Sequence, residues 1–131
     1  MDVKDAKASH PEWVAQGAKF AIIDYNDRST LLEAFKGVEV VISTVKGSPE
    51  AIQSQKALAD AAQAVGIEIF VPSEFGGVAT GRNAALKIKI LDYLKEIGLP
   101  YVVFYTGAWA DLTFGPWVSS YFDLHLKDAH S

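Results

Sequence analysis

The chain has 131 residues, half of them apolar and 21% charged, with a formal net charge of −4. These values are typical of a single globular domain over residues 1–131 that can bury a core. The acidic balance disfavours a nucleic-acid partner, the absence of cysteine excludes disulfides and thiolate catalysis, and no stretch approaches the roughly 18 apolar residues of a membrane span. Because the N-terminal residues include no apolar leader segment, we expect a cytoplasmic protein without a membrane partner.

The first elements follow a polar lead-in over residues 1–18. "KFAIID", residues 19–24, is short and rich in Ile and Phe, which predicts a strand. "YNDRSTLLEAFKG" then predicts a helix, because Thr30 and Glu33 have the spacing of a capping box and Gly37 suits its C-terminal end.

"VEVVIST", residues 38–44, is a nearly continuous β-branched run, which is typical of a strand buried on both faces. A helix should follow it, because Ser48 can cap the helix, Pro49 suits its first position and Glu50 its first turn. Gly66 ends this helix. Its apolar face consists of Leu58, Ala61, Ala62 and Val65.

"IEIFV", residues 67–71, predicts a third strand, and "YVVFYT", residues 101–106, a fourth. Between them, a loop over residues 72–82 precedes a helix that runs to about Ile97, where Gly98 stops it. This alternation predicts an α/β fold, partial Rossmann-like, with a mostly parallel sheet of about four strands and crossover helices. Because ligands bind such sheets outside the carboxyl ends of the strands, the loops after the strands are the candidate site.

The last helix places a lysine on its apolar face. Lys87 precedes Ile90 by three residues and Leu94 by seven, so it shares their side of the helix. An unpaired buried ammonium is costly. Two interpretations remain open: Lys87 reaches water or pairs with Glu74, or it is an ammonium held beside a reacting group as proton donor or oxyanion stabiliser.

Several segments together resemble the NmrA-like and isoflavone reductase-like family, atypical short-chain dehydrogenases with a Rossmann fold. They are "FVPSEFG" at a strand end, the helix that carries Lys87, and "GLPYVVFYTGAW" after it. "KGVEVVISTV" and "QKALADAAQAVGIEIFVPSEFG" resemble the family's fourth strand, the next helix and the fifth strand, so the resemblance runs from about Gly17 to Leu112. It implies a reductase of small enone- or quinone-like molecules that uses NADP or NAD.

The resemblance also implies roles for individual residues, with Lys87 as the catalytic lysine near the nicotinamide. The residues expected along the cofactor are Asp24 and Tyr25 near the adenine, Ser43, Thr44 and Val45 beside the dinucleotide, and Pro72, Ser73, Glu74 and Phe75 at the nicotinamide end. Without the resemblance, the last four fit an ordinary turn equally well, since Gly76 and Gly77 permit one.

The family's phosphate-binding loop, G-x-x-G-x-x-G, does not occur among the ten glycines of this sequence. Residues 1–18 are too few and too polar for a strand, a helix and a second strand. We therefore expect the chain to begin after the family's second strand and, in isolation, to bind NADPH weakly or not at all. The strand over residues 19–24 would then pair with residues 38–44 or be poorly anchored.

Residues 107–131 form an aromatic-rich tail, which would either cover part of the sheet or present Trp109, Phe114 and Trp117 to a protein partner. The three histidines, His10, His125 and His130, do not cluster with carboxylates, so no metal site is expected.

Three functions follow from these observations. The first is a reductase in which Lys87 stabilises the developing oxyanion of a small-molecule substrate. The second is a non-enzymatic NAD(P)-sensing module that binds a protein, and the third is an interaction fragment without cofactor.

Overall fold

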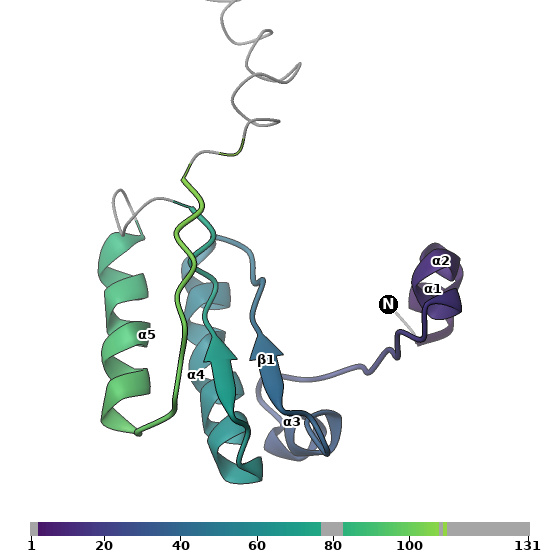
Figure 1. Ribbon diagram of the computed structural model, residues 1–131, viewed down its shortest axis with the longest axis horizontal. Helices are drawn as coiled ribbons and strands as arrows, with labels where there is room; N and C mark the ends of the chain where they lie inside the picture. The colour runs from purple at the N-terminus through teal and green to yellow at the C-terminus, as the bar shows by residue number, and fades with distance from the viewer. Residues whose placement is uncertain (1–2, 77–82, 108, 110–131) are drawn as a thin grey trace, which may run out of the picture.

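The computed structural model describes residues 3–76, 83–107 and 109. The elements in chain order are α1 (Val3–Ser9), α2 (Pro11–Ala15), α3 (Arg28–Ala34), β1 (Val40–Ile42), α4 (Pro49–Val65), β2 (Ile69–Val71) and α5 (Ala84–Glu96). The strands β1 and β2 pair in parallel, with Val41 opposite Phe70, and Tyr101 adds a parallel bridge to Phe70. Helix α4 connects the two strands and α5 leads back to the bridge (Figure 1), so the predicted parallel α/β fold is confirmed.

Helix α4 begins and ends where the sequence predicts. The side chain of Ser48 accepts the backbone N–H of Ala51, Pro49 is the first helical residue, and Gly66 ends the helix in the left-handed conformation with φ 73°. Glycine has no Cβ to oppose that conformation. The helix therefore buries its apolar face without leaving its termini uncapped.

The core lies between the strands and helices α3, α4 and α5. Phe70 of β2 and Leu94 of α5 are fully buried at its centre. The other buried apolar members of this cluster are Leu31, Val41, Ile52, Leu58, Ala59, Ala61, Ala62, Ile67, Ile90 and Leu99. This packing fixes α4 and α5 against the sheet and so positions the loops at its carboxyl edge.

The sheet is smaller than the predicted four strands within the described residues. Residues 19–24 are not a strand, and Ile22 is 54% exposed. A strand is stable only where a neighbour pairs with it, and these residues run past β1 without pairing (Figure 1). Residues 101–106 also form only the one bridge.

The expectation that residues 38–44 are buried on both faces was wrong. In β1, Val41 is buried, whereas Val40 is 46% exposed and Ile42 61% exposed. Side chains alternate across a strand, so Val41 faces the helices and its two neighbours face the other side. The described helices that contribute to the core cover one face of the sheet, and the second face is apolar and open along β1, whereas Val71 of β2 on that face is only 4% exposed.

Helix α3 begins differently from its predicted capping box. Asp27 is the N-cap and accepts the backbone N–H of Ser29 at 2.9 Å. The hydroxyl of Thr30 instead donates to the carbonyl of Asp27 at 2.8 Å, and Glu33 forms an ion pair with Lys36. Asp27 caps because aspartate at this position reaches the first free N–H groups of the helix.

The lead-in contains two short helices that the sequence analysis did not predict. They stand apart from the sheet in Figure 1. Pro11 occupies the first turn of α2, and the ring of His10 stacks on Trp13 with 4.1 Å between centroids. Of the helices that the structure describes, none is both long and apolar enough to cross a lipid bilayer.

Candidate functional site

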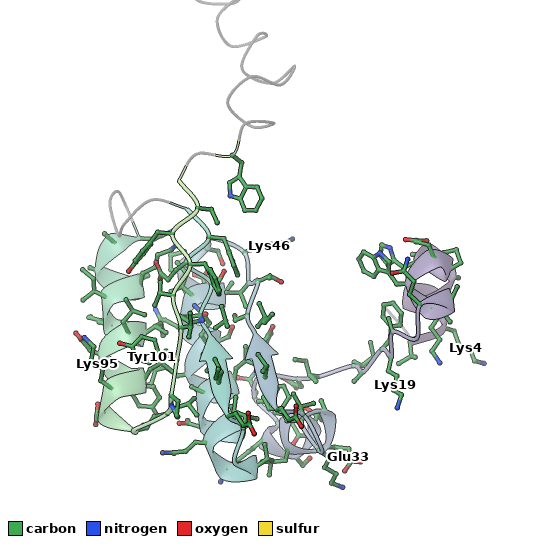
Figure 2. The ribbon with its side chains drawn as sticks, viewed as in Figure 1. Lys4, Lys19, Glu33, Lys46, Lys95 and Tyr101 are labelled. Carbon is green, nitrogen blue, oxygen red and sulfur yellow. The ribbon has the colours of Figure 1, made fainter. Side chains whose placement is uncertain are left out.

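Lys87 and Glu74 meet at the carboxyl edge of the sheet. Lys87 lies in the first turn of α5, and its Nζ is 3.5 Å from Oε2 of Glu74 in the loop after β2. The Lys87 side chain is 23% exposed and that of Glu74 is not exposed at all. By contrast, Lys95 points away from the sheet on the outer side of α5 (Figure 2). The predicted position of Lys87 on the inner face of α5 is confirmed. Its contact with Glu74 is one of the alternatives that the sequence left open.

The Glu74 carboxyl group is fully buried but lacks the hydrogen bonds that a buried carboxylate needs. Among the described residues, neither of its oxygens has a hydrogen-bond donor, and the Lys87 ammonium lies slightly farther away than in a short charge-assisted bond. Burial raises the pKa of Glu74 above its ordinary value of 4.5, and the attraction of Lys87 opposes part of that rise. The positive charge of Lys87 therefore offsets part of the energetic cost of burying the Glu74 carboxylate.

The backbone next to Glu74 is held by a buried glutamine of α4. The N–H of Ser73 donates to Oε1 of Gln55 at 2.8 Å, and Gln55 is fully buried. Gln55 was not predicted from the sequence, although a signal was present: it is a polar residue on the apolar face of α4, three residues before Leu58. Its amide fixes the position of the loop after β2.

Two further hydrogen bonds tie the loop after β1 to this corner. The hydroxyl of Ser73 donates to the carbonyl of Val45 at 3.1 Å. The side-chain amide of Asn83, at the start of α5, donates to the carbonyl of Gly47. Three segments that are distant in sequence therefore converge at one edge, where Figure 2 also shows Lys46.

Phe75 contacts the segment after the bridge. Its ring is nearly parallel to that of Phe104, with 6.5 Å between centroids, and its carbonyl accepts the indole N–H of Trp109 at 3.3 Å. The backbone of Gly107 also donates to the carbonyl of Gly76 at 3.0 Å. Pro72, before the corner, is among the fully buried residues. The corner is thus braced from both sides.

A cavity of about 250 Å³ lies beside β1 and is lined by most of the residues predicted for the adenine and dinucleotide part of the cofactor. It is lined by Tyr25, Ser43, Thr44 and Val45, together with Ile23, Phe35, Val41, Ile42 and Leu58. Ser43 is buried, and its hydroxyl has no hydrogen-bond partner among the described residues. An unsatisfied hydroxyl at such a position is suited to a polar ligand group.

Asp24, which was predicted near the adenine, does not line this cavity. Its carboxylate instead accepts the backbone N–H of Asn26 at 2.8 Å and the side-chain amide of Asn26 at 3.2 Å. Its backbone N–H donates to the hydroxyl of Thr30 at 3.0 Å. Asp24 therefore builds the turn before α3.

The described residues contain no candidate metal site, and of the tail only Gly107 and Trp109 are described. No group of three or more histidine or acidic side chains there could hold a metal ion. His10 lies 3.7 Å from Glu12 on the lead-in helices. The other residues named from the sequence, namely Gly77, Phe114, Trp117, His125 and His130, lie outside the described residues.

A parallel β-α-β unit whose strand-end loops line a cavity is the arrangement of Rossmann-type nucleotide-binding proteins. Residues 3–122 match the sequence profile of the NmrA-like family, so the chain belongs to that family. This confirms the resemblance seen in the sequence.

Two relatives are informative. The chain is 34% identical over 119 residues to "Oxidoreductase aprR" of Aspergillus flavus, covering 82% of this chain and 38% of that protein. It is also 34% identical over 115 residues to "Phenylcoumaran benzylic ether reductase IRL1" of Ginkgo biloba, covering 76% of this chain and 37% of that protein. The chain therefore spans less than two fifths of the length of these relatives, which are named as oxidoreductases.

Solved structures agree with this assignment. The NADPH complex of leucoanthocyanidin reductase from Vitis vinifera matches with a TM-score of 0.54 and 29% identity, over 62% of this chain and 31% of that one. AtPrR2 with NADP+ and (+)pinoresinol matches with a TM-score of 0.58 and 29% identity, over 71% and 34%. An isoflavone reductase structure, at 23% identity and a TM-score of 0.73, supports the fold over 87% of this chain and 39% of that one.

Proposed function

We propose that this chain carries the nicotinamide-side edge of an NAD(P)H-dependent reductase of small enone- or quinone-like molecules. The observation that supports this most is the Lys87 ammonium, held 3.5 Å from a fully buried Glu74 at the carboxyl edge of a parallel sheet. The similar solved reductases contain NADPH or NADP+. When bound, such a cofactor supplies the hydride.

Lys87 has a specific role in the proposed reaction. As a carbonyl group is reduced, negative charge develops on its oxygen. Lys87, with 23% of its side chain exposed, presents an ammonium that can donate a hydrogen bond or a proton to that oxygen. Because Glu74 lies on the buried side of Lys87, the ammonium is left to face the open side of the edge.

The fit to a dinucleotide is partial. Tyr25, Thr44 and the unsatisfied hydroxyl of Ser43 line a cavity that suits the adenine-side part of the cofactor. The 131 residues contain no glycine-rich turn spaced to cradle a pyrophosphate. We therefore propose that the chain alone binds NADPH weakly.

A second candidate function is a non-enzymatic NAD(P)-sensing or protein-interaction module. Exposed apolar side chains on the open side of the sheet favour it, because contiguous apolar surface often marks a partner site. The residues concerned are Val40, Ile42, Val102 and Phe104. The tail after Trp109 would be part of that partner surface.

Titration of the purified chain with NADPH, followed by nicotinamide fluorescence, tests the proposal. Saturable micromolar binding, with slow hydride transfer to a panel of enones and quinones, supports the reductase. Lys87→Ala should then abolish turnover, whereas Lys89→Ala, on the exposed face of the same helix, should not. Binding that survives Lys87→Ala without any turnover in the wild-type chain supports the sensing module.

A further inference from the structure

The pair at the sheet edge is asymmetric, and the asymmetry points to a role for Glu74. Its side chain has no exposed surface, whereas that of Lys87 is 23% exposed. The carboxylate therefore lies behind the ammonium as seen from solvent. A group that acts on a ligand from the open side would be Lys87, and a group that holds it there would be Glu74.

The position of Glu74 is fixed by neighbours other than Lys87. Ser73, directly before it, is bonded through its N–H to Gln55 and through its hydroxyl to Val45. Its own backbone N–H donates to the carbonyl of Pro72 at 2.8 Å. The backbone of Glu74 is thus held against α4 and the sheet, while Lys87 arrives from α5 on a long side chain.

Stability alone does not explain a glutamate at this position. A buried ion pair stabilises a fold no more than well-packed apolar residues of similar volume, because the charges lose their hydration. Here the cost is high, since neither oxygen of Glu74 receives a hydrogen bond from a described residue. The pair is better explained by what it does to the amine of Lys87.

We propose that Glu74 is the positioning residue for Lys87: its buried carboxylate, 3.5 Å from the amine, holds the amine at the carboxyl edge of the sheet. The role follows the general pattern in which a reacting side chain is oriented by a second, buried group. It rests on the proposed reductase function, because that function gives Lys87 its task. The charge of Glu74, and not only its shape, should therefore control where the Lys87 amine lies and how easily a reagent reaches it.

The test measures the amine directly. The full chain is acylated with dilute acetic anhydride at mildly alkaline pH, and the rate at each lysine is read by peptide mass spectrometry. Glu74→Gln keeps the shape and removes the charge that holds the amine in the pair, so the Lys87 amine is released toward the open edge and should be acylated several-fold faster. Lys89, exposed two residues farther on, is the internal control and should not change.

Conservative variants separate charge from packing. Glu74→Asp keeps the charge and should label as slowly as the wild type, whereas Glu74→Met, which is uncharged and of similar volume, should label as fast as Glu74→Gln. Circular dichroism establishes that each variant is folded. Equal labelling of Lys87 in the folded wild type, Glu74→Gln and Glu74→Met would overturn the proposal, as would fast labelling of a folded Glu74→Asp.

The assay needs neither cofactor nor turnover, so the two proposals fail separately. If the charge of Glu74 governs labelling but NADPH does not bind, the positioning role stands and the reductase function falls. If Lys87 is required for turnover and Glu74→Gln changes neither labelling nor turnover, the reductase function stands and the positioning role falls.

Discussion

The amide oxygen of Gln55 accepts the backbone N–H of Ser73 at 2.8 Å, joining the middle of α4 to the corner that carries Glu74. Gln55→Leu would leave that part-buried N–H without this partner. The expected loss in free energy of unfolding is about 1–3 kcal/mol, measured by urea denaturation. Gln53→Leu is the matched control, because Gln53 is exposed on the same helix; its effect should stay within about 0.5 kcal/mol. Equal effects would show that the bond contributes nothing.

The two partners of the ion pair should differ in their cost when removed. Lys87→Met strands the fully buried Glu74 carboxylate, which should lower the free energy of unfolding by about 3 kcal/mol at neutral pH. Glu74→Gln should cost less, because the side chain of Lys87 is partly exposed and can still reach water. Combining Lys87→Met with Glu74→Gln should recover most of the loss, since no charge is then buried. A double variant as unstable as the sum of the two would contradict the pairing.

The raised pKa of Glu74 gives the stability a particular pH dependence. Burial raises the pKa above 4.5 in the folded chain, so the folded state binds a proton more tightly than the unfolded state. This proton stabilises the fold fully below 4.5, and the contribution is lost as pH rises through the raised folded value. We expect the free energy of unfolding of the wild type, minus that of Glu74→Gln, to increase as pH falls from neutral through this window. A constant difference over that range would contradict the buried state of Glu74.

The sequence predicts well what short-range chemistry decides. The ends of α4 follow from Ser48 and Gly66, because caps act within a few residues. The inner position of Lys87 follows from helical periodicity, which its contact with Glu74 confirms. Where two local signals compete, spacing is not enough: Asp27 caps α3 although Thr30 has the spacing of a capping box.

Features that depend on residues far apart in the sequence were either not predicted or predicted wrongly. Residues 19–24 have the composition of a strand, but a strand forms only where another lies beside it. The hydrogen bond from Ser73 to Gln55 joins residues 18 positions apart. The sequence could mark Gln55 as an unusual polar residue of an apolar face, but it could not identify the partner.

Ser43 offers a test of the cavity beside β1. Its buried hydroxyl has no partner among the described residues, so Ser43→Ala should raise the free energy of unfolding by about 1 kcal/mol. If the hydroxyl serves the nucleotide, the same variant should weaken NADPH binding severalfold in the fluorescence titration. Ser54→Ala is the control, because the Ser54 hydroxyl is already bonded to the carbonyl of Ala51 at 2.7 Å; it should give no gain in stability and leave binding unchanged. A destabilised Ser43→Ala with unchanged affinity would contradict both roles.

The open face of the sheet can be compared with its buried face on the same strand. Ile42→Thr changes a side chain that is 61% exposed, so the free energy of unfolding should change by less than about 0.5 kcal/mol. Val41→Thr places a hydroxyl against the core and should cost about 1–3 kcal/mol. If Ile42→Thr proves as costly as Val41→Thr, a further layer covers that face in solution, and the protein-interaction function loses its supporting observation.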